Sequence, residues 1–396
     1  MDVGARTQGR GRPAGWSAGK AEQSPGVSAD TLHFATVITP DADPVKRQGM
    51  LAVLERFFAD KNEFLRGGRR TIQSAHGIKY LVTRAWRLHV WELSGPPENW
   101  QAQLDRRLAE EPVFALISGL GGRTWAPVHR FCERAGLPCL FPNVDLPVAA
   151  EDDFYSVYLS PGVLLEAQLM LRSLGDAGQP AAGGRVIQIY RKGDIGEQAA
   201  RSLRAGADAM GLKIVDRALD SDADLPAALA HTPGDALVLW LRPPDLRALP
   251  AAGPGDAAVY LSGILADLER APLPAAWRAT ARMAYPFDPP ERRAVRMNYP
   301  LGWLRVRQVP VVAERVQSDT YLACGILAEN LTDMLDSFVR DYLLERSEVM
   351  LSSKLTTAYY PRLTLAPGQR FTSRGGYLAR LDGSGRVLAD TEWIVP

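Results

Sequence analysis

Hydrophobic residues along the first part of the chain form short apolar runs that alternate with amphipathic segments. Segments 32–38, 87–93, 113–118 and 139–141 predict strands, and the near-continuous apolar run at 113–118 predicts a strand covered on both faces. Segments 48–60, 100–110 and 125–135 repeat their apolar residues at helical spacing and predict helices between those strands. This order of elements predicts right-handed βαβ units around a parallel sheet.

A second series of the same kind follows. Apolar runs at 184–190, 213–219, 235–241 and 258–263 predict strands, and 197–210 predicts a helix. Between the two series lie a strand at 154–160, a helix at 161–174 and the flexible stretch DAGQPAAGG. The sequence therefore predicts two α/β lobes in tandem.

The pattern changes after the run at 279–287. Segment 319–335 has apolar residues three and four apart and predicts a long helix, and a further helix extends to 350. The last part of the chain alternates and contains Gly375–Gly376, which predicts antiparallel strands. We therefore expect the chain to cross back between the lobes. Segment 66–84 has an unclear pattern and is either a hairpin or an insertion.

One segment, EEPVFALISGLGGRTWAPVHRFCERAGLPCLFPN from Glu111 to Asn143, joins a predicted strand, a glycine loop, a helix and a second strand. Gly119, Gly121 and Gly122 allow a sharp turn, and Thr124 can cap the helix that follows. Backbone N–H groups at a helix N-terminus beside the carboxyl edge of a sheet favour an anion. Because glycine loops close such turns in any α/β protein, a purely structural role stays open.

The composition is that of a soluble globular protein. Its net charge is too small to attract nucleic acid or an anionic membrane. The 396 residues are 46% hydrophobic, and 46 basic against 45 acidic residues give a net charge of +1. No apolar run approaches the length of a membrane-spanning helix, and the first 30 residues contain no stretch suited to a secretory signal. We expect these 30 residues to be a disordered extension.

Motif searches give no enzymatic or metal signature. The loop GLGGRT departs from the dinucleotide pattern because its sixth residue is Thr124. The five histidines are scattered, and no serine lies in a GxSxG motif. Cys132 and Cys139 could bridge helix and strand, but free buried cysteines are the commoner case. We expect no cofactor and no metal.

The order of elements resembles the type I periplasmic solute-binding proteins of the branched-chain amino acid and amide ABC transporter group (Leu/Ile/Val-binding protein-like). Three segments carry the resemblance: ALISGLGGRTWAPVHRFCERAGLPCLFPN, GRVIQIYRKGDIGEQAARSLRAGADAMGLKIV and DTYLACGILAENL. The resemblance covers nearly the whole chain from Leu32 onward. It implies a type I periplasmic-binding-protein fold, in which each lobe is a mainly parallel sheet flanked by helices and crossover hinge strands join the lobes. It further implies a protein that closes on a small solute, and not an enzyme.

The resemblance also implies a set of ligand-binding residues on the two sides of the interlobe cleft. In lobe 1 these are Ser118, Gly122, Arg123, Thr124 and Asn143. In lobe 2 they are Tyr190, Asp194, Gly196, Ser262 and Tyr285. Each has a structural alternative, since hydroxyl and Asp side chains cap helices and tyrosines pack in cores. Arg123 is unusual where the family has small or hydroxyl residues, so it either pairs with a carboxylate or fills the cleft.

The implied organisation is a disordered segment 1–30, a lobe 1 of 31–159 plus 288–352, and a lobe 2 of 160–287 plus 353–396. The implied function is capture of a small polar or carboxylate-bearing solute for an ABC transporter permease by a monomer in the periplasm. No nucleic acid and no direct membrane insertion are expected. Three alternatives stay open: a ligand-sensing receptor, a degenerate member that binds nothing, and an α/β enzyme that uses Asp194 as its acid or base.

Overall fold

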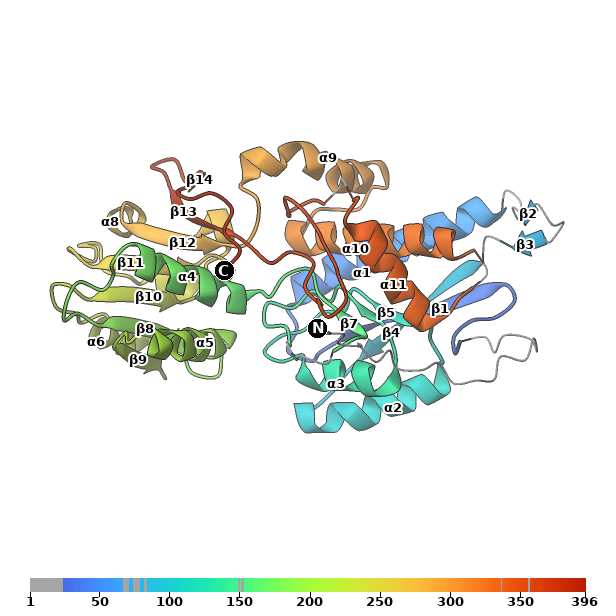
Figure 1. The fold of residues 1–396 in the computed structure, drawn as a ribbon, viewed down its shortest axis with the longest axis horizontal. Helices are drawn as coiled ribbons and strands as arrows, with labels where there is room; N and C mark the ends of the chain where they lie inside the picture. The colour runs from blue at the N-terminus through green and yellow to red at the C-terminus, as the bar shows by residue number, and fades with distance from the viewer. Residues whose placement is uncertain are drawn as a thin grey trace, which may run out of the picture.

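The computed structural model describes residues 24–66, 71–73, 79–81, 84–148, 150, 153–335, 337–354 and 357–396. Figure 1 shows two α/β lobes side by side, one containing β1 to β7 and the other β8 to β14. The two-lobe architecture with mainly parallel sheets that the sequence predicted is confirmed.

The first sheet has the strand order β4-β1-β5-β6-β7, and all its pairs are parallel. Its strands are β1 (Thr31–Ile38), β4 (Ala85–Glu92), β5 (Ala115–Ile117), β6 (Cys139–Leu140) and β7 (Ser156–Val157). All three residues of β5 are buried, as the continuous apolar run predicts for a strand covered on both faces.

The second sheet has the order β14-β13-β12-β11-β10-β8-β9. Five parallel strands are β8 (Val186–Arg191), β9 (Ile214–Leu219), β10 (Ala236–Trp240), β11 (Ala258–Ser262) and β12 (Ala281–Tyr285). The last two, β13 (Tyr377–Leu381) and β14 (Val387–Ala389), are antiparallel. The predicted antiparallel end of the chain is thus an extension of the second sheet.

Helices cover both sheets. Those of the first half are α1 (Pro44–Arg66), α2 (Trp100–Glu110), α3 (Ala126–Ala135), α4 (Val163–Asp176) and α5 (Ile195–Ala209). Shorter turns are η1 (Pro97–Asn99), η2 (Asp222–Asp224), α6 (Leu225–Ala228), α7 (Pro243–Arg247), η3 (Leu268–Arg270) and α8 (Ala275–Arg278). The late helices are α9 (Pro290–Val306), α10 (Glu314–Met334) and α11 (Arg340–Leu351). Helix α10 packs against α1 and α11, and α4 packs against α5.

Helix α9 was not predicted from the sequence. It contains Pro300 and exposes Val295 and Val306, so its apolar residues do not form one buried stripe. Figure 1 shows it lying along the top of the molecule, where it leads from the second sheet towards α10.

Three stretches of chain connect the lobes. They join β7 to α4, β12 to α9, and α11 to β13. The third stretch crosses back in Figure 1, and along it Phe371 pairs with Tyr158 in the first. Several crossing stretches of this kind permit hinge motion between lobes. The division into lobe 1 (31–159 plus 288–352) and lobe 2 (160–287 plus 353–396) stays a proposal.

The described part of segment 66–84 contains β2 (Thr71–Gln73) and β3 (Lys79–Leu81), which pair as an antiparallel ribbon. Residues 24–30, placed by the sequence analysis in the N-terminal segment, form a turn in which Val27 bridges to Leu32. The expectation for residues 1–23 lies outside the described residues.

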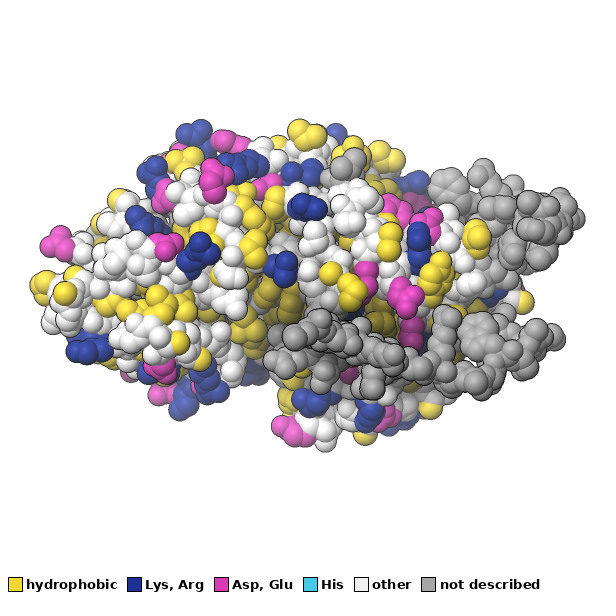
Figure 2. Space-filling model, viewed as in Figure 1, with side chains coloured by type: hydrophobic (Ala, Val, Ile, Leu, Met, Phe, Trp, Pro, Cys, Tyr) yellow, Lys and Arg dark blue, Asp and Glu magenta, His cyan; other side chains and the backbone are white. Residues whose placement is uncertain are grey.

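Figure 2 shows acidic and basic side chains interspersed over both lobes, as the balanced composition predicts. Among the described residues, no helix is long and apolar enough to cross a membrane. All three cysteines are buried free thiols, which answers the question left open for Cys132 and Cys139.

Candidate functional site

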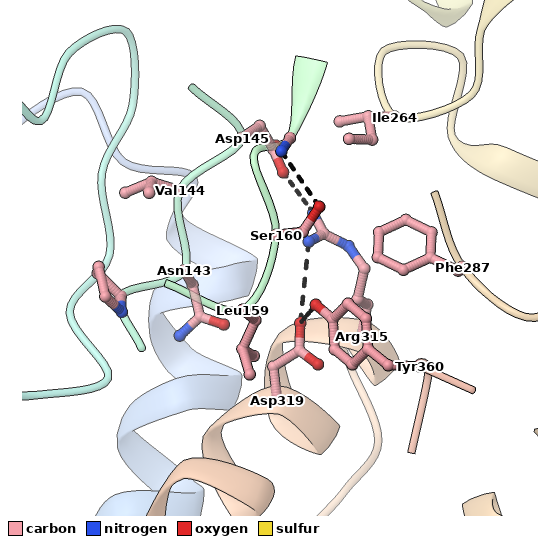
Figure 3. Close-up of a pocket in the computed structure, with 12 residues that line it drawn as sticks. Asn143, Val144, Asp145, Leu159, Ser160, Ile264, Phe287, Arg315, Asp319 and Tyr360 are labelled. Carbon is pink, nitrogen blue, oxygen red and sulfur yellow. Dashed lines mark hydrogen bonds and ion pairs between the residues drawn. The ribbon is translucent and has the colours of Figure 1, made fainter. Parts of the chain in front are cut away.

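A narrow pocket with a cavity volume of about 20 Å³ lies between the two sheets (Figure 3). It is lined from both lobes and from the stretches that connect them, by Pro142, Asn143, Val144, Asp145, Leu159, Ser160, Gly162, Ile264, Phe287, Arg315, Asp319 and Tyr360. A neighbouring pocket shares Ile264 and Arg315 and extends along Lys46 and the segment 267–270.

The lining residues lie where parallel strands end. Asn143 follows β6 and Ile264 follows β11, whereas Leu159 and Phe287 follow β7 and β12. Ligands of open α/β sheets bind outside the carboxyl ends of the strands, and here the carboxyl ends of both sheets meet at one pocket. The pocket therefore lies where open α/β sheets commonly bind ligands.

An ion pair occupies the centre of this pocket. Arg315, in the first turn of α10, donates to Asp145 at 2.6 Å, and its guanidinium lies 5.6 Å from the centre of the Phe287 ring. Lys46 lies 3.5 Å from the same carboxylate. Burial alone would raise the pKa of Asp145, but the charges of Arg315 and Lys46 hold it well below its ordinary value. Asp145 is thus an anion that is already neutralised within the pocket.

Asp319 lies one turn further along α10, and its pKa is shifted in the direction opposite to that of Asp145. Only 3% of its surface is exposed, its Oδ2 accepts a hydrogen bond from the Tyr360 hydroxyl at 3.3 Å, and Arg315 is 3.9 Å away. Burial raises the pKa of Asp319 to about 7, against the opposing effect of Arg315. The pocket therefore contains one fixed carboxylate and one that titrates near neutral pH.

The glycine loop beside the pocket is closed by the chain's own side chains. The Arg123 N–H donates to Asp41 Oδ2 at 2.8 Å, and the Gly122 N–H donates to the Thr39 hydroxyl at 3.0 Å. That hydroxyl in turn donates to Asp41 Oδ1 at 2.7 Å. An internal carboxylate thus occupies the position where the sequence predicted a ligand anion.

Of the ten predicted site residues, Asn143 lines the pocket. Ser118 lies directly behind it, because the Asn143 amide donates to the Ser118 hydroxyl at 2.9 Å. Ser262 lies behind the opposite wall, where Glu166 accepts from its hydroxyl and from the N–H of Ile264 at 2.8 Å. Ser118 and Ser262 therefore position lining residues.

Tyr285 is also behind the wall. Its hydroxyl donates to Glu269 at 3.0 Å and accepts from Arg293 at 2.7 Å, and the side chain is fully buried. Tyr190 lies half-buried at the end of β8, and Gly196 packs in α5 so closely on Trp240 that a Cβ atom would lie 2.9 Å from its backbone oxygen. Neither Tyr190 nor Gly196 is among the residues that line the pocket.

Asp194 and Arg123 carry charges on opposite lobes. Asp194 caps α5 and binds Arg242 through two bonds of 2.6 and 2.8 Å. Burial would raise the pKa of Asp194, but Arg242, the Ile195 N–H and the charge of Arg123 together hold it below its ordinary value. A carboxylate held ionised in this way is poorly suited to acid–base catalysis.

Arg123 and Thr124 serve the loop itself. The Arg123 side chain is 70% exposed and its Nε lies 3.5 Å from Asp41 Oδ2, a carboxylate of the chain itself. The Thr124 hydroxyl accepts from the Ala126 N–H at 3.3 Å, as expected for a residue before a helix.

The sequence analysis missed the charged residues of the pocket. Arg315 and Asp319 are four apart at the start of α10, and Asp145 follows the predicted strand by only a few residues. The spacing of Arg315 and Asp319 was a usable signal, since residues at i and i+4 share one helix face. Nothing local in the sequence connects them to Asp145.

One cluster has the residue types of a metal site, namely His129, Glu133 and Asp153. Their polar atoms already have partners within the chain. His129 contacts Asp153 at 3.0 Å and the Tyr158 hydroxyl at 2.8 Å, and Glu133 accepts backbone N–H groups from residues 154–156. These bonds hold the segment before β7 against α3, which gives the cluster a structural role.

No protein-family model and no curated protein matches this sequence. The fold is nevertheless similar to solved structures. A substrate-binding periplasmic protein from Ralstonia solanacearum has a TM-score of 0.63 at 16% identity, covering 91% of this chain and 100% of that one. A fatty acid ABC transporter substrate-binding protein from Thermomonospora curvata has a TM-score of 0.65 at 14% identity, covering 95% of each chain.

A third similar structure is a branched chain amino acid ABC transporter protein from Thermus thermophilus with bound valine. Its TM-score is 0.63 at 13% identity, and the match covers 93% of this chain and 96% of that one. The resemblance read from the sequence is thus confirmed as a likeness of fold to periplasmic substrate-binding proteins.

Proposed function

We propose that this protein is an extracytoplasmic solute-binding protein that captures a small polar or carboxylate-bearing solute between its lobes for an ABC transporter. The solute would be an amino acid, an amide or an organic acid. The observation that carries the proposal is the pocket at which the carboxyl ends of both sheets meet, with charged groups of both signs inside it. In this conformation the cavity of about 20 Å³ has room for roughly one water molecule, so a solute enters only when the lobes open further.

Capture works through closure of the lobes. Because three connecting stretches join them, the lobes can rotate about this hinge while each sheet stays intact. A solute that touches both lobes favours the closed state and shifts the population towards it. Ile264 from one lobe and Asp145 from the other would then contact the same molecule.

The fold neighbours support the class of function and leave the solute open. The Thermus protein holds valine and the Thermomonospora protein is a fatty acid binder, so one fold serves solutes of very different polarity. The charges in this pocket favour a polar solute over a fatty acid, since an apolar chain would leave Asp319 buried without new partners. A transporter permease as partner and a periplasmic location belong to the same proposal.

A thermal-shift screen of amino acids, amides and short organic acids, followed by calorimetry, tests the proposal. A true solute raises the unfolding temperature, because a ligand that binds only the folded state stabilises it. It also makes the protein more compact in small-angle X-ray scattering. If well-folded protein binds no member of the screen, the proposal is overturned.

One observation favours a second candidate, a degenerate member that no longer binds a solute. Arg315 lies within the pocket, paired with Asp145 and over the Phe287 ring, where it could itself take the place of a ligand. A sensory receptor with the same fold would differ in its partner and not in its pocket. Solute binding in the screen separates the first candidate from the degenerate one.

A further inference from the structure

Two buried oxygen atoms that line the interlobe pocket have no hydrogen-bond partner among the described residues. They are Oδ1 of Asn143 and Oδ1 of Asp319. The two residues are 8% and 3% exposed, so water does not readily replace the missing partner. The amide oxygen of Asn143 is an acceptor, as is Oδ1 of Asp319 when the carboxyl is ionised, and a buried acceptor without a donor costs about 1–3 kcal/mol.

The orientation of the Asn143 amide is fixed by its other contacts. Its Nδ2 donates to the Ser118 hydroxyl at 2.9 Å and lies 3.4 Å from the Gly119 carbonyl, which can only accept. A flipped amide would bring two oxygens together there. The oxygen of Asn143 therefore has to face the pocket side, as Figure 3 shows.

Asp319 is held in a comparable way. Its Oδ2 takes the hydroxyl of Tyr360 and faces Arg315, and these contacts leave Oδ1 free. The two free oxygens come from different elements, the end of β6 and the helix α10, yet line one pocket. Two free oxygens that line one pocket are complementary to donor groups on a ligand.

The other polar groups near the pocket are already used. Asp41 occupies the N–H of Arg123, and Arg315 and Lys46 both neutralise Asp145. A donor that binds the two free oxygens displaces none of these internal contacts.

Resting on the proposed function, we propose that Asn143 and Asp319 form the subsite that selects the solute, by binding a hydrogen-bond donor such as a protonated amine or an amide N–H. Recognition of the donor takes place on the hinge side of the cleft, and the glycine loop acts as a structural support. A solute without a donor leaves both oxygens unpaired and binds weakly.

The test uses matched solutes and matched variants of the full chain in calorimetric titrations. Each amino acid or amide is compared with the acid of the same skeleton that lacks the nitrogen. We expect wild-type protein to prefer the nitrogen-bearing member by about 10- to 100-fold, the range for a hydrogen bond to a charged group. Equal binding of both members, or a preference for the acid, overturns the inference.

The variant Asp319→Asn should reduce affinity for the nitrogen-bearing solute at least about 10-fold and leave the matched acid within about 3-fold. Asn143→Ala is the second variant, and Asp333→Asn, at the exposed end of the same helix, is the control that should bind as wild type. Circular dichroism shows whether each variant folds. If a variant does not fold, the comparison of matched solutes on wild-type protein tests the inference by itself. A folded Asp319→Asn protein that binds both solutes as before contradicts the inference while leaving the proposed function intact. If no solute of either kind binds wild type, both are overturned.

Discussion

Asp41 accepts a hydrogen bond from the backbone N–H of Arg123 at 2.8 Å, across 82 positions of sequence. Asp41 lies in the loop between β1 and α1, and the contact brings its carboxylate to the glycine loop that follows β5. Although partial burial alone would raise the pKa of Asp41, the N–H of Arg123 and the Thr39 hydroxyl hold it below its ordinary value. The loop is therefore preorganised by an internal anion, and this explains why it does not need a solute to satisfy its amides.

Replacing Asp41 should loosen this loop. Asp41→Ala removes the carboxylate from the N–H of Arg123 and from Thr39, and we expect it to lower the free energy of unfolding by about 2 kcal/mol. It should also create a weak site for acetate or sulfate, since the freed amides lie before a helix. Urea denaturation and anion titration measure the two effects.

The control for this variant is Asp43→Ala. Asp43 accepts the N–H groups of Val45 and Lys46 at 2.8 and 2.9 Å and so caps α1, which is worth about 1 kcal/mol. The Asp43→Ala variant should lose stability without gaining a binding site for acetate or sulfate. Equal anion binding by both variants would show that the loop is not specifically closed by Asp41.

Gly122 is required by the same contact. A Cβ atom at this position would lie 2.4 Å from the Asp41 carboxyl carbon, so Gly122→Ala must displace the carboxylate. We expect a loss of about 1–3 kcal/mol in urea denaturation. Gly302→Ala in α9, where an added Cβ meets nothing within 4 Å, should instead stabilise by about 0.5–1 kcal/mol. A neutral Gly122→Ala protein would contradict the tight packing of Asp41.

Most of the fold could be predicted because buried parallel strands have a strong local signature. The runs that form β5, β10 and β11 are almost entirely apolar, and the helices α2 and α3 begin and end within one residue of the predicted bounds. Helix α9 escaped prediction because its apolar side chains point both inwards and into solvent. Tertiary contacts stabilise it: the helix packs against α10, Trp303 packs on Phe57 of α1, and Arg293 donates to Tyr285 and Glu269.

The site was harder to predict than the fold. The Asn143 position follows from its place after a strand, but Arg315 and Asp145 are 170 positions apart and meet only through packing. Sequence spacing likewise cannot reveal that Asp41 fills the glycine loop, because that contact depends on the paths of two separate loops. Functional side chains at the meeting point of several elements are in general not encoded by any one segment.

The buried carboxyl of Glu166 should make stability depend on pH. Burial raises its pKa in the folded protein to about 8, from an ordinary value of 4.5. The folded state therefore retains a proton that the unfolded state loses, and the resulting stability is lost as pH rises from 4.5 to 8.

Glu166→Gln removes this dependence, since a glutamine does not titrate. Between pH 5 and 8, the free energy of unfolding of wild type should fall relative to the variant by about 1.4 kcal/mol per pH unit. Urea denaturation at several pH values measures the difference. A difference that does not change with pH would show that Glu166 is not held protonated.

Removing only one member of the Arg315–Asp145 ion pair should strongly lower the free energy of unfolding. Arg315→Met leaves Asp145 with only Lys46 at 3.5 Å, and we expect a loss of about 3 kcal/mol in denaturation. Arg315→Met with Asp145→Asn should recover more than half of it, because no charge is then left unpaired. Arg346→Met, which breaks a more exposed pair with Asp333, should cost less than about 1 kcal/mol. An equal loss in the single and double variants would contradict this account.

Calorimetric titration of the folded protein with small polar solutes tests the central claim, capture of a solute in the interlobe pocket, most directly. Ile264→Trp fills the space shared by the two neighbouring pockets, whereas Val295→Trp changes an exposed position of α9 that is 74% accessible. The account predicts that at least one solute binds wild type and Val295→Trp with one molecule per chain, and binds Ile264→Trp at least about 10-fold more weakly. Binding by no solute, or equally tight binding by Ile264→Trp, would contradict it.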